Sequence, residues 1–252
     1  MEHAGKHALV TGGGTGIGAG IALALAQAGA EVTITGRRAD KLAEVAGQHD
    51  SLHSLVMDVD DEASIRSGIA QAATERGPIQ ICVANAGIAE GGPFAKTTLA
   101  QWRKMMMTNL DGVFLTFQAA MATLPVDMPA RMIVVSSIAG VRGLKNAVPY
   151  TVTKHGVIGL IRGLSEEYMR SPITFNALCP GYVDTDIVRN QLPGLMKRFD
   201  VDETGARGLM AKGNRHQTLL EVDEITAAAM WLCSDGARSV NGQTIQISGG
   251  QV

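Results

Sequence analysis

The sequence predicts an α/β fold, with one domain built on a doubly wound, mostly parallel sheet of seven strands and helices on both faces. Two observations lead to this prediction. Short apolar runs rich in valine and isoleucine alternate with longer segments of helical period, as in a series of βαβ units. These runs are apolar on both faces, which is typical of parallel strands covered by helices on each side. A chain of 252 residues can form one large core, and we expect a single domain over residues 1–252.

The predicted elements follow one another in a regular order. The first half of the chain contains four strands, at 7–11, 31–35, 54–59 and 80–87. Helices separate and follow them, at 20–29, 40–48, 62–75 and, in a long amphipathic stretch, 98–120. The second half contains strands at 131–137, 173–180 and 243–250, with helices around Tyr150 and over 221–235. Between these lies a polar segment, at about 184–216, that we expect to be irregular.

Composition and charge exclude several classes of function. The chain has 46% hydrophobic and 18% charged residues, which indicates a folded protein and not a disordered one. Its net charge of −2 provides no long-range positive field, so we expect neither a nucleic-acid partner nor a membrane partner. Cys82, Cys179 and Cys233 are widely spaced and form no CxxC motif, so we expect reduced, buried thiols and no metal site. The first residues contain no apolar signal segment, and we therefore expect a cytoplasmic protein.

The first strand leads directly into a glycine-rich turn, TGGGTGIG at residues 11–18, and then into a helix. Gly12 permits the sharp turn, Gly16 allows a pyrophosphate to approach the backbone, and Gly18 lets the helix pack closely on the strand. The alternative is a glycine-rich turn that binds nothing. The position of the motif between the strand and the helix of the first βαβ unit favours a dinucleotide site.

The end of the second strand bears on which dinucleotide is bound. An acidic residue there would accept the ribose hydroxyls of NAD, but the chain has Gly36 followed by Arg37 and Arg38. Two guanidinium groups suit a 2′-phosphate, so NADP(H) is favoured. If the two arginines are instead a solvated pair before a helix, the cofactor is NAD(H). Asp58 ends the third strand, where it either binds the adenine amino group or caps the next helix.

Residues 137–154 hold Ser137, Tyr150 and Lys154 in one short window. Tyr150 and Lys154 are four residues apart, so in a helix they lie on one face. A phenol that acts as an acid and base near neutral pH needs its pKa lowered by roughly 3 units, or about 4 kcal/mol. One neighbouring charge at ~4 Å supplies about that much at an effective dielectric constant of ~20. We therefore expect Lys154 to lower the pKa of Tyr150.

Two further segments contain candidate residues. Asn85, Ala86 and Gly87 follow the fourth strand at the edge of the sheet where ligands bind in such folds, and we expect them to contact the nicotinamide side of the cofactor. Asn109 lies inside the long amphipathic helix although asparagine has a low helix propensity, which makes it a candidate functional residue. The neighbouring run of three methionines, 105–107, is assigned to the core or to a subunit interface.

Together these motifs resemble the short-chain dehydrogenase/reductase family, in its branch of about 250 residues, over essentially the whole chain. TGGGTGIG resembles the family's TGxxxGxG motif, and residues 85–87 resemble its NNAG element. SIAG at 137–140 is similar to the segment of the catalytic serine, and YTVTK at 150–154 to the YxxxK motif. Pro180, Gly181 and Thr185 are similar to the loop that contacts the nicotinamide. The resemblance implies a Rossmann fold.

The resemblance also implies a catalytic tetrad, made up of Asn109, Ser137, Tyr150 and Lys154. Ser137 is chosen over Ser136 because it stands thirteen residues before Tyr150, as in the family pattern. The implied roles are a hydrogen bond from Ser137 to a carbonyl oxygen, a proton from Tyr150, and contact of Lys154 with the nicotinamide ribose. Asn109 is implied to hold a water that returns the proton through Lys154.

The implied cofactor-binding set combines these motifs. It comprises Gly12, Gly14, Thr15, Gly16, Ile17, Gly18, Arg37, Arg38, Asp58, Val59, Asn85, Ala86, Gly87, Tyr150, Lys154, Pro180, Gly181, Val183 and Thr185. The expected substrate-binding residues are Ser137, Tyr150 and two apolar walls, Leu144 and Tyr182. Residues 184–216 are expected to form a substrate lid, because they follow the sixth strand at the ligand edge.

The sequences of several segments resemble those of reductases that act on 3-oxoacyl thioesters and polyketides, and those of bacterial 3-hydroxyacyl-CoA dehydrogenases. Members that act on carrier proteins have arginines at two positions that here are Met128 and Ser171, with Arg131 and Arg170 nearby but off register. A free ketone, a secondary alcohol and a CoA thioester therefore remain open as substrates. A small positive excess in the lid indicates either an anionic substrate or a solvated charged surface.

The expected activity is the interconversion of a ketone and a secondary alcohol by hydride transfer, with Tyr150 as general acid and base and NADP(H) favoured. One alternative is an NAD-dependent secondary-alcohol or 3-hydroxyacyl-CoA dehydrogenase that works in the oxidative direction. A second is a non-catalytic cofactor-binding protein, which need not retain all four tetrad residues. The resemblance further implies a homotetramer, a dimer of dimers, formed through the helix at 102–121, the Tyr150 helix and the last strand.

Overall fold

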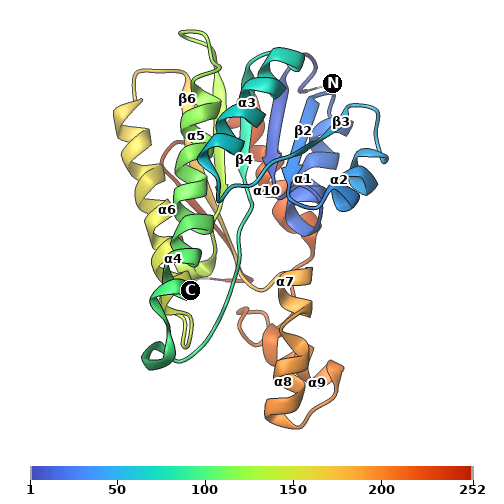
Figure 1. Cartoon of the computed structure of the whole chain (residues 1–252), viewed down its shortest axis with the longest axis vertical. Coiled ribbons are helices and arrows are strands. Elements are labelled where there is room, and N and C mark those ends of the chain that lie inside the picture. The colour runs from blue at the N-terminus through green and yellow to red at the C-terminus, as the bar shows by residue number, and fades with distance from the viewer. Residues whose placement is uncertain (1, 251–252) are drawn as a thin grey trace.

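The seven strands form one fully parallel sheet, as the computed structural model of residues 2–250 shows (Figure 1). Residues 1, 251 and 252 of the expected domain lie outside the described residues. The strands are β1 (His7–Thr11), β2 (Glu31–Gly36), β3 (Leu52–Val56), β4 (Ile79–Ala84), β5 (Ala130–Val135), β6 (Ile173–Pro180) and β7 (Thr244–Ile247). The predicted fold class is confirmed.

The strand order is β3-β2-β1-β4-β5-β6-β7, so the chain builds outward from β1 in one direction and then from β4 in the other. β1 pairs with both β2 and β4, which places the reversal between β1 and β4. The loops that leave these two strands diverge to opposite faces of the sheet. Doubly wound folds bind their ligands in the crevice that this divergence opens at the carboxyl edge.

Successive residues of the strands point to opposite faces, and each face carries its own core. Val10 of β1 packs on the face covered by α1 (Gly16–Gln27), α2 (Ala39–Ala46) and α10 (Val222–Cys233). Leu9 packs on the other face, covered by α3 (Glu62–Arg76), α5 (Gly112–Met121) and α6 (Val148–Glu167). Three short 3₁₀ turns complete this part, η1 (Phe94–Lys96), η3 (Ile138–Gly140) and η4 (Asp235–Ala237). None of the helices within residues 2–250 combines the length and apolar character needed to span a bilayer.

The long helix predicted at 98–120 is interrupted. α4 (Leu99–Met106) gives way to a π-helical segment, η2 (Met107–Asp111), before α5 begins. At the junction with α5, Gly112 lies close to the loop that follows β3. A Cβ on Gly112 would be 2.8 Å from the Val59 carbonyl oxygen. The wider π turn shifts the register of the helix at this contact, and Asn109 lies within that turn. Asn109 therefore marks a local break in the helix.

The segment expected to be irregular forms three short helices, α7 (Asp186–Arg189), α8 (Leu192–Phe199) and α9 (Glu203–Ala211), so that expectation was wrong. Leu192, Ala206 and Met210 are buried together in a small core of their own. Apolar residues at helical spacing among the charges are sufficient to fold these helices against each other. In Figure 1 they extend from the carboxyl edge of the sheet, below the strands. We call residues 184–216 the lid.

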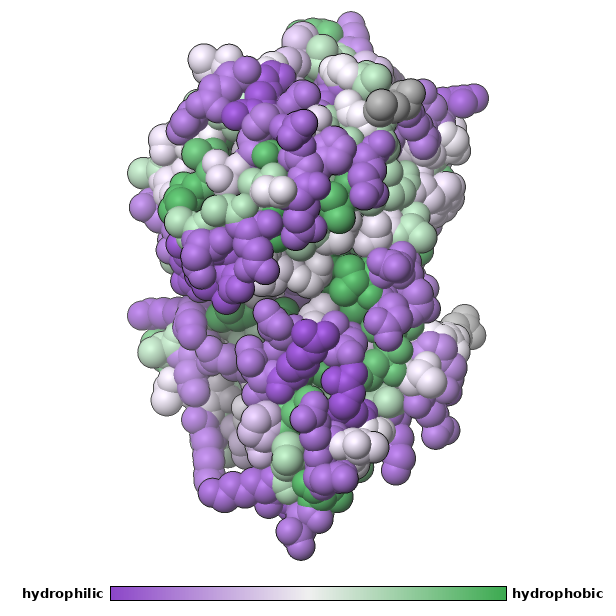
Figure 2. Space-filling view, turned by 90° about the vertical axis from the view of Figure 1, so that its right-hand side faces the viewer, coloured by the Kyte–Doolittle hydropathy of each residue, from purple (hydrophilic) through white to green (hydrophobic). Residues whose placement is uncertain are grey.

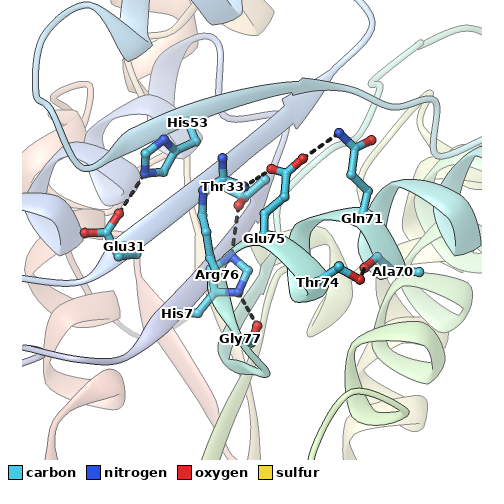
Figure 3. Close-up of polar contacts among 10 residues, drawn as sticks. All are labelled: His7, Glu31, Thr33, His53, Ala70, Gln71, Thr74, Glu75, Arg76 and Gly77. Carbon is cyan, nitrogen blue, oxygen red and sulfur yellow. Dashed lines mark hydrogen bonds and ion pairs between the residues drawn. The ribbon is translucent and has the colours of Figure 1, made fainter.

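A buried histidine lies at the opposite, amino edge of the sheet (Figure 3). His7 of β1 has its Nδ1 atom 2.8 Å from the Gly77 carbonyl oxygen and its Nε2 atom 2.9 Å from the Thr33 hydroxyl. A neutral ring suits this geometry, with one nitrogen donating to the carbonyl and the other accepting from the hydroxyl. Burial lowers the pKa of His7, and the nearby Arg76 and His53 lower it further, against the Gly77 carbonyl and Glu31, which raise it.

We predict that protonation of His7 destabilises the protein in acid. The pKa of His7 in the folded protein lies below its ordinary value of 6.5. The contribution of neutral His7 to the free energy of unfolding is therefore complete above pH 6.5 and declines as the pH falls below that value. Urea midpoints at about pH 7.5 and about pH 5.5 should differ less in His7→Asn than in the parent protein. The exposed His155, replaced in the same way, is the control. An equal acid shift in the His7 variant and the parent would contradict the prediction.

Candidate active site

A cavity of about 490 Å³ opens at the carboxyl edge of the sheet, between the glycine turn, the ends of β2 to β4 and the lid. Figure 2 shows a hollow between the upper body and the lower lobe that carries α7 to α9, with hydrophilic residues on its rims and hydrophobic residues inside it. Thirteen of the predicted cofactor residues line the cavity, namely Gly12, Gly14, Thr15, Gly16, Ile17, Arg37, Arg38, Asp58, Val59, Asn85, Ala86, Gly87 and Thr185.

A smaller cavity of about 100 Å³ adjoins the first, and the two share lining residues such as Asn85, Gly87 and Thr185. Its lining brings together six more of the predicted residues, namely Ser137, Tyr150, Lys154, Pro180, Gly181 and Val183. Residues that follow β1 and β4 and residues of β5, β6 and α6 thus line two adjoining cavities. Sequence reasoning missed some of its lining, including Lys41, Asp60, Ile88, Thr108 and Ile187.

The glycine turn is shaped by close backbone contacts. Gly12 has a φ of +66°, in the left-handed region that favours glycine. A Cβ on Gly18 would lie 2.4 Å from the Gly12 carbonyl oxygen, so only glycine lets α1 begin this close to the turn. The amide of Asn85 donates to the carbonyl oxygens of Thr11 (3.0 Å) and Gly12 (3.2 Å). β4 therefore holds the turn in place at the point where the strand order reverses.

Two features of the turn were not predicted. Gly13, to which sequence reasoning assigned no role, packs so tightly that a Cβ there would be 2.7 Å from the Cβ of Ile34. Its N–H donates to the Thr35 carbonyl at 3.1 Å, which ties the turn to β2. The unbroken run of three glycines was the available signal. Gly18, although required by packing, does not line the cavity.

The end of the larger cavity beside β2 and β3 is lined by charged residues. The Nη1 atom of Arg37 lies 3.9 Å from the Asp60 carboxylate, and Arg38 is exposed at the start of α2. The carboxylate of Asp58 accepts a hydrogen bond from the Asp60 N–H at 3.0 Å. The cap of α3 is Asp61, which accepts from the N–H groups of the first helical turn. The alternative of Asp58 as a helix cap is therefore wrong.

Asn109 is buried and spans two segments. Its side-chain oxygen accepts from the Ile88 N–H at 2.8 Å, and its amide donates to the Ile88 carbonyl at 2.8 Å. The same amide lies 3.3 Å from the Thr153 hydroxyl, which in turn donates to the Tyr150 carbonyl at 2.8 Å. The side chain thus joins the loop after β4 to the first turns of α6. Only a side chain that has both a donor and an acceptor can make both contacts with Ile88.

The window at 137–154 folds back on itself, so that the end of β5 lies against α6. The ammonium of Lys154 donates to the Val135 carbonyl at 2.8 Å, and the Ser136 hydroxyl donates to the Lys154 carbonyl at 3.1 Å. The Nζ atom of Lys154 lies 5.6 Å from the centroid of the Tyr150 ring. The hydroxyl of Ser137 accepts from the Ala139 N–H at 3.1 Å. Ser137, Tyr150 and Lys154 all face the smaller cavity.

Burial controls the electrostatics of this group. It raises the pKa of Tyr150, and a hydrogen bond with Ser137 only partly opposes the shift. It lowers the pKa of Lys154 to about 8. We expected the lysine to lower the pKa of the phenol, and in this structure the pKa moves the other way. The reason is that burial of the phenol disfavours its charged form. The Lys154 ammonium is bound to the Val135 carbonyl.

Leu144 and Tyr182 were expected to form apolar walls around the substrate. In the described part of the chain, residues 2–250, neither of them lines either cavity. Tyr182 packs against the small core of the lid. Its backbone is held by Asn214, whose side chain accepts from the Tyr182 N–H at 2.8 Å and donates to its carbonyl at 2.9 Å. A Cβ on Gly181 would lie 2.0 Å from the Asn214 side-chain oxygen. Asn214 is buried in the lid, and no sequence motif pointed to it.

Residues 6–195 match the family model described as short chain dehydrogenase. The chain belongs to the short-chain dehydrogenase family. An acetoacetyl-CoA reductase of Rhizobium meliloti (strain 1021) is 33% identical over 244 residues, which cover 97% of this chain and 97% of that protein. A levodione reductase of Leifsonia aquatica is 34% identical over 253 residues, which cover 96% and 92% of the two chains.

A solved structure of a short-chain dehydrogenase fold supports the same assignment. The crystal structure of a variant actinorhodin polyketide ketoreductase with NADPH superposes with a TM-score of 0.92 at 28% identity, covering 97% of this chain and 96% of that one. The predicted family is confirmed.

We predict that Gly140→Ala separates α6 from β5. A Cβ there would lie 2.6 Å from the Lys154 carbonyl oxygen and 2.7 Å from the Ser136 hydroxyl, so the helix must move. Overpacking of this kind costs about 1–3 kcal/mol of folding free energy. Gly143→Ala is the control, because a Cβ at Gly143 meets no atom within 4 Å. Urea unfolding measures both, and equal stability of the two variants would contradict the prediction.

Proposed function

We propose that this chain is an NADP(H)-dependent oxidoreductase that interconverts a ketone and a secondary alcohol. The observation that carries the proposal is the meeting of two groups of residues around one space. The glycine turn and two arginines line one end of it, and Ser137, Tyr150 and Lys154 line the other. Relatives named acetoacetyl-CoA reductase and levodione reductase, and a ketoreductase solved with NADPH, support carbonyl reduction with this cofactor.

The residues of the larger cavity fit a dinucleotide. Gly16, with a φ of +55°, has no side chain of its own between its backbone and the Thr185 side chain, which leaves room there for a pyrophosphate to approach the backbone. The start of α1 adds the partial positive charge of a helix N-terminus. Arg37 and Arg38 would hold a 2′-phosphate, and Asp58 the adenine amino group. When bound, the nicotinamide supplies hydride in the reductive direction and accepts it in the oxidative one.

At the other end, Ser137 and Tyr150 would donate hydrogen bonds to the carbonyl oxygen of the substrate. These bonds strengthen as negative charge develops on that oxygen, which lowers the barrier to its reduction. The raised pKa of Tyr150 keeps the phenol protonated at neutral pH, so it can deliver its proton to the developing alkoxide. In the oxidative direction the phenolate would take the proton back from the alcohol.

Lys154 and Asn109 would support the proton transfer. With its pKa near 8, Lys154 carries its positive charge at neutral pH and stabilises the phenolate that remains on Tyr150. We assign to Lys154 contact with the nicotinamide ribose as well. Asn109 fixes the backbone at Ile88 beside the lysine, and we assign to it the water that returns a proton to Lys154. A protein that only bound the cofactor would not need these four residues together.

The substrate is proposed to be a 3-oxoacyl thioester or another ketone. We further propose a homotetramer, because α4, α5 and α6 expose large apolar residues such as Leu99, Phe114 and Val152 along one side. The last strand and α10, where Trp231 is 46% exposed, would make the second contact. Three free, buried cysteines suit a reducing compartment, and we propose the cytoplasm.

We predict that Tyr150→Phe abolishes turnover and leaves cofactor binding intact. Loss of the proton donor should lower kcat by about 10²–10⁴-fold, because phenylalanine keeps the ring but has no proton to give. NADPH binding, followed by fluorescence titration, should be unchanged. Tyr168→Phe is the matched control, since Tyr168 packs by its ring against Phe175. Turnover of the Tyr150 variant at the parent rate would refute the assignment.

We predict that the arginines after β2 set the cofactor preference. Arg37→Ala and Arg38→Ala should each lower kcat/KM for NADPH by about 10–100-fold, the effect of losing a charged hydrogen bond. kcat/KM for NADH should change little. Arg66→Ala, which removes an exposed arginine paired with Glu62, is the control. An NADH preference in the parent protein, or equal losses with both cofactors, would contradict this prediction.

A further inference from the structure

The reaction end of the cavity is uncharged apart from one residue. Among the residues around Ser137 and Tyr150, the lining includes the aliphatic side chains of Ile17, Ile88, Val135, Ile187 and Val188, and the uncharged polar residues Asn85, Ser136 and Thr185. Over residues 2–250, Lys154 is the only charged side chain in this lining. A substrate whose carbonyl oxygen meets Ser137 and Tyr150 therefore places its neighbouring atoms mainly against uncharged side chains.

Lys154 is already committed to other partners. Its ammonium is bound to the Val135 carbonyl, the residue is 6% exposed, and the proposed function gives its other contacts to the Tyr150 phenolate and the nicotinamide ribose. Ser137 and Tyr150 are neutral donors, and both are needed by the carbonyl oxygen. A carboxylate next to the reacting carbonyl would lose its water without gaining a free cation, and burial of an unpaired charge is strongly unfavourable.

Two arginines of the lid are paired with the carboxylate of Asp184. Arg207 of α9 donates to one oxygen of the Asp184 carboxylate, and Arg189 of α7 donates to the other at 2.9 Å. The side chain of Asp184 is 15% exposed, whereas those of Arg189 and Arg207 are 56% and 34% exposed, so an enclosed carboxylate holds two partly exposed guanidinium groups at the base of the lid. Asp184 immediately precedes Thr185, which lines both cavities.

This cluster is held firmly. The N–H of Asp184 donates to the Leu220 carbonyl at 2.9 Å, next to the parallel bridge between Val183 and Leu220. The hydrogen bond from Arg207 lowers the pKa of Asp184, and the bond from Arg189 adds to the effect against the opposing effect of burial. The carboxylate thus stays ionised at neutral pH and keeps both guanidinium groups.

We infer that the site selects ketones with uncharged groups beside the carbonyl, such as esters and thioesters, over keto acids, and that Asp184 sets this selectivity by holding Arg189 and Arg207. The inference rests on the proposed function and narrows its substrate class. It concerns charge close to the reacting carbon. A substrate that carries charge at its far end, outside this lining, remains compatible with the site.

Three matched pairs of ketones test the inference on the parent protein: ethyl pyruvate and pyruvate, ethyl acetoacetate and acetoacetate, and ethyl levulinate and levulinate. Within each pair the reacting ketone is the same, and the acid has a carboxylate where the ester has an uncharged ethyl ester. The pair whose ester gives the highest kcat/KM with NADPH is used for the comparison. In that pair we expect kcat/KM for the ester to exceed kcat/KM for the acid by about 100-fold or more. Acids reduced as efficiently as their esters would overturn the inference and leave the proposed function intact. Reduction of none of the six would instead count against the proposed function.

Asp184→Asn tests the role of the carboxylate. It removes the negative charge and one of the two acceptor oxygens, so at least one guanidinium group loses its partner. The ratio of ester to acid should then fall by about tenfold, mainly through better reduction of the acid. Asp200→Asn is the matched control, because Asp200 is an exposed lid residue at a left-handed position that asparagine also adopts. An unchanged ratio in a folded Asp184 variant would remove Asp184 from the proposal. If that variant does not fold, the ratio in the parent protein still decides whether the site selects against charge.

Discussion

The contact between β5 and α6 is the constraint on which the rest of the site depends. The Lys154 ammonium is bound to the Val135 carbonyl inside the protein, and the Ser136 hydroxyl is bound to the Lys154 backbone. Gly140 allows this approach, because any side chain there would meet the helix. Ser137 at the end of the strand and Tyr150 on the helix face each other only while these contacts hold. The same burial sets the protonation of both titrating groups, raising the pKa of Tyr150 and lowering that of Lys154.

A second set of contacts joins this group to the dinucleotide end of the cavity. Asn85 holds the glycine turn from β4, and Asn109 holds the loop that follows the same strand. Both are amides that donate and accept at fixed backbone positions, so the two ends of the cavity are positioned by one strand. On the far side, Asn214 and Asp184 fix the lid to the end of β6. Arg189 and Arg207 are thereby paired within the lid, and Lys154 is the only charged side chain that lines the reaction end among residues 2–250.

The sequence was sufficient to predict what depends on local pattern. Apolar runs and helical periods indicated the sheet and its covering helices, and the left-handed φ of Gly12 agrees with the sharp turn expected there. Features that depend on contacts between distant segments could not be predicted. The π turn at Asn109 adjoins a contact between Gly112 and Val59, and Gly181 is restricted by Asn214. The direction of the Tyr150 pKa shift depends on burial, which the four-residue spacing to Lys154 does not reveal.

The central claim is that hydride passes within this cavity to the carbon of a carbonyl whose oxygen is held by Ser137 and Tyr150. Transfer of deuterium from NADPH labelled at C4 of the nicotinamide tests it most directly, with ethyl acetoacetate as substrate and mass spectrometry of the product. We predict an alcohol that carries the deuterium on its carbinol carbon when the label is on one face of the nicotinamide, and an unlabelled alcohol when it is on the other. An alcohol free of deuterium with both labelled cofactors would contradict the claim.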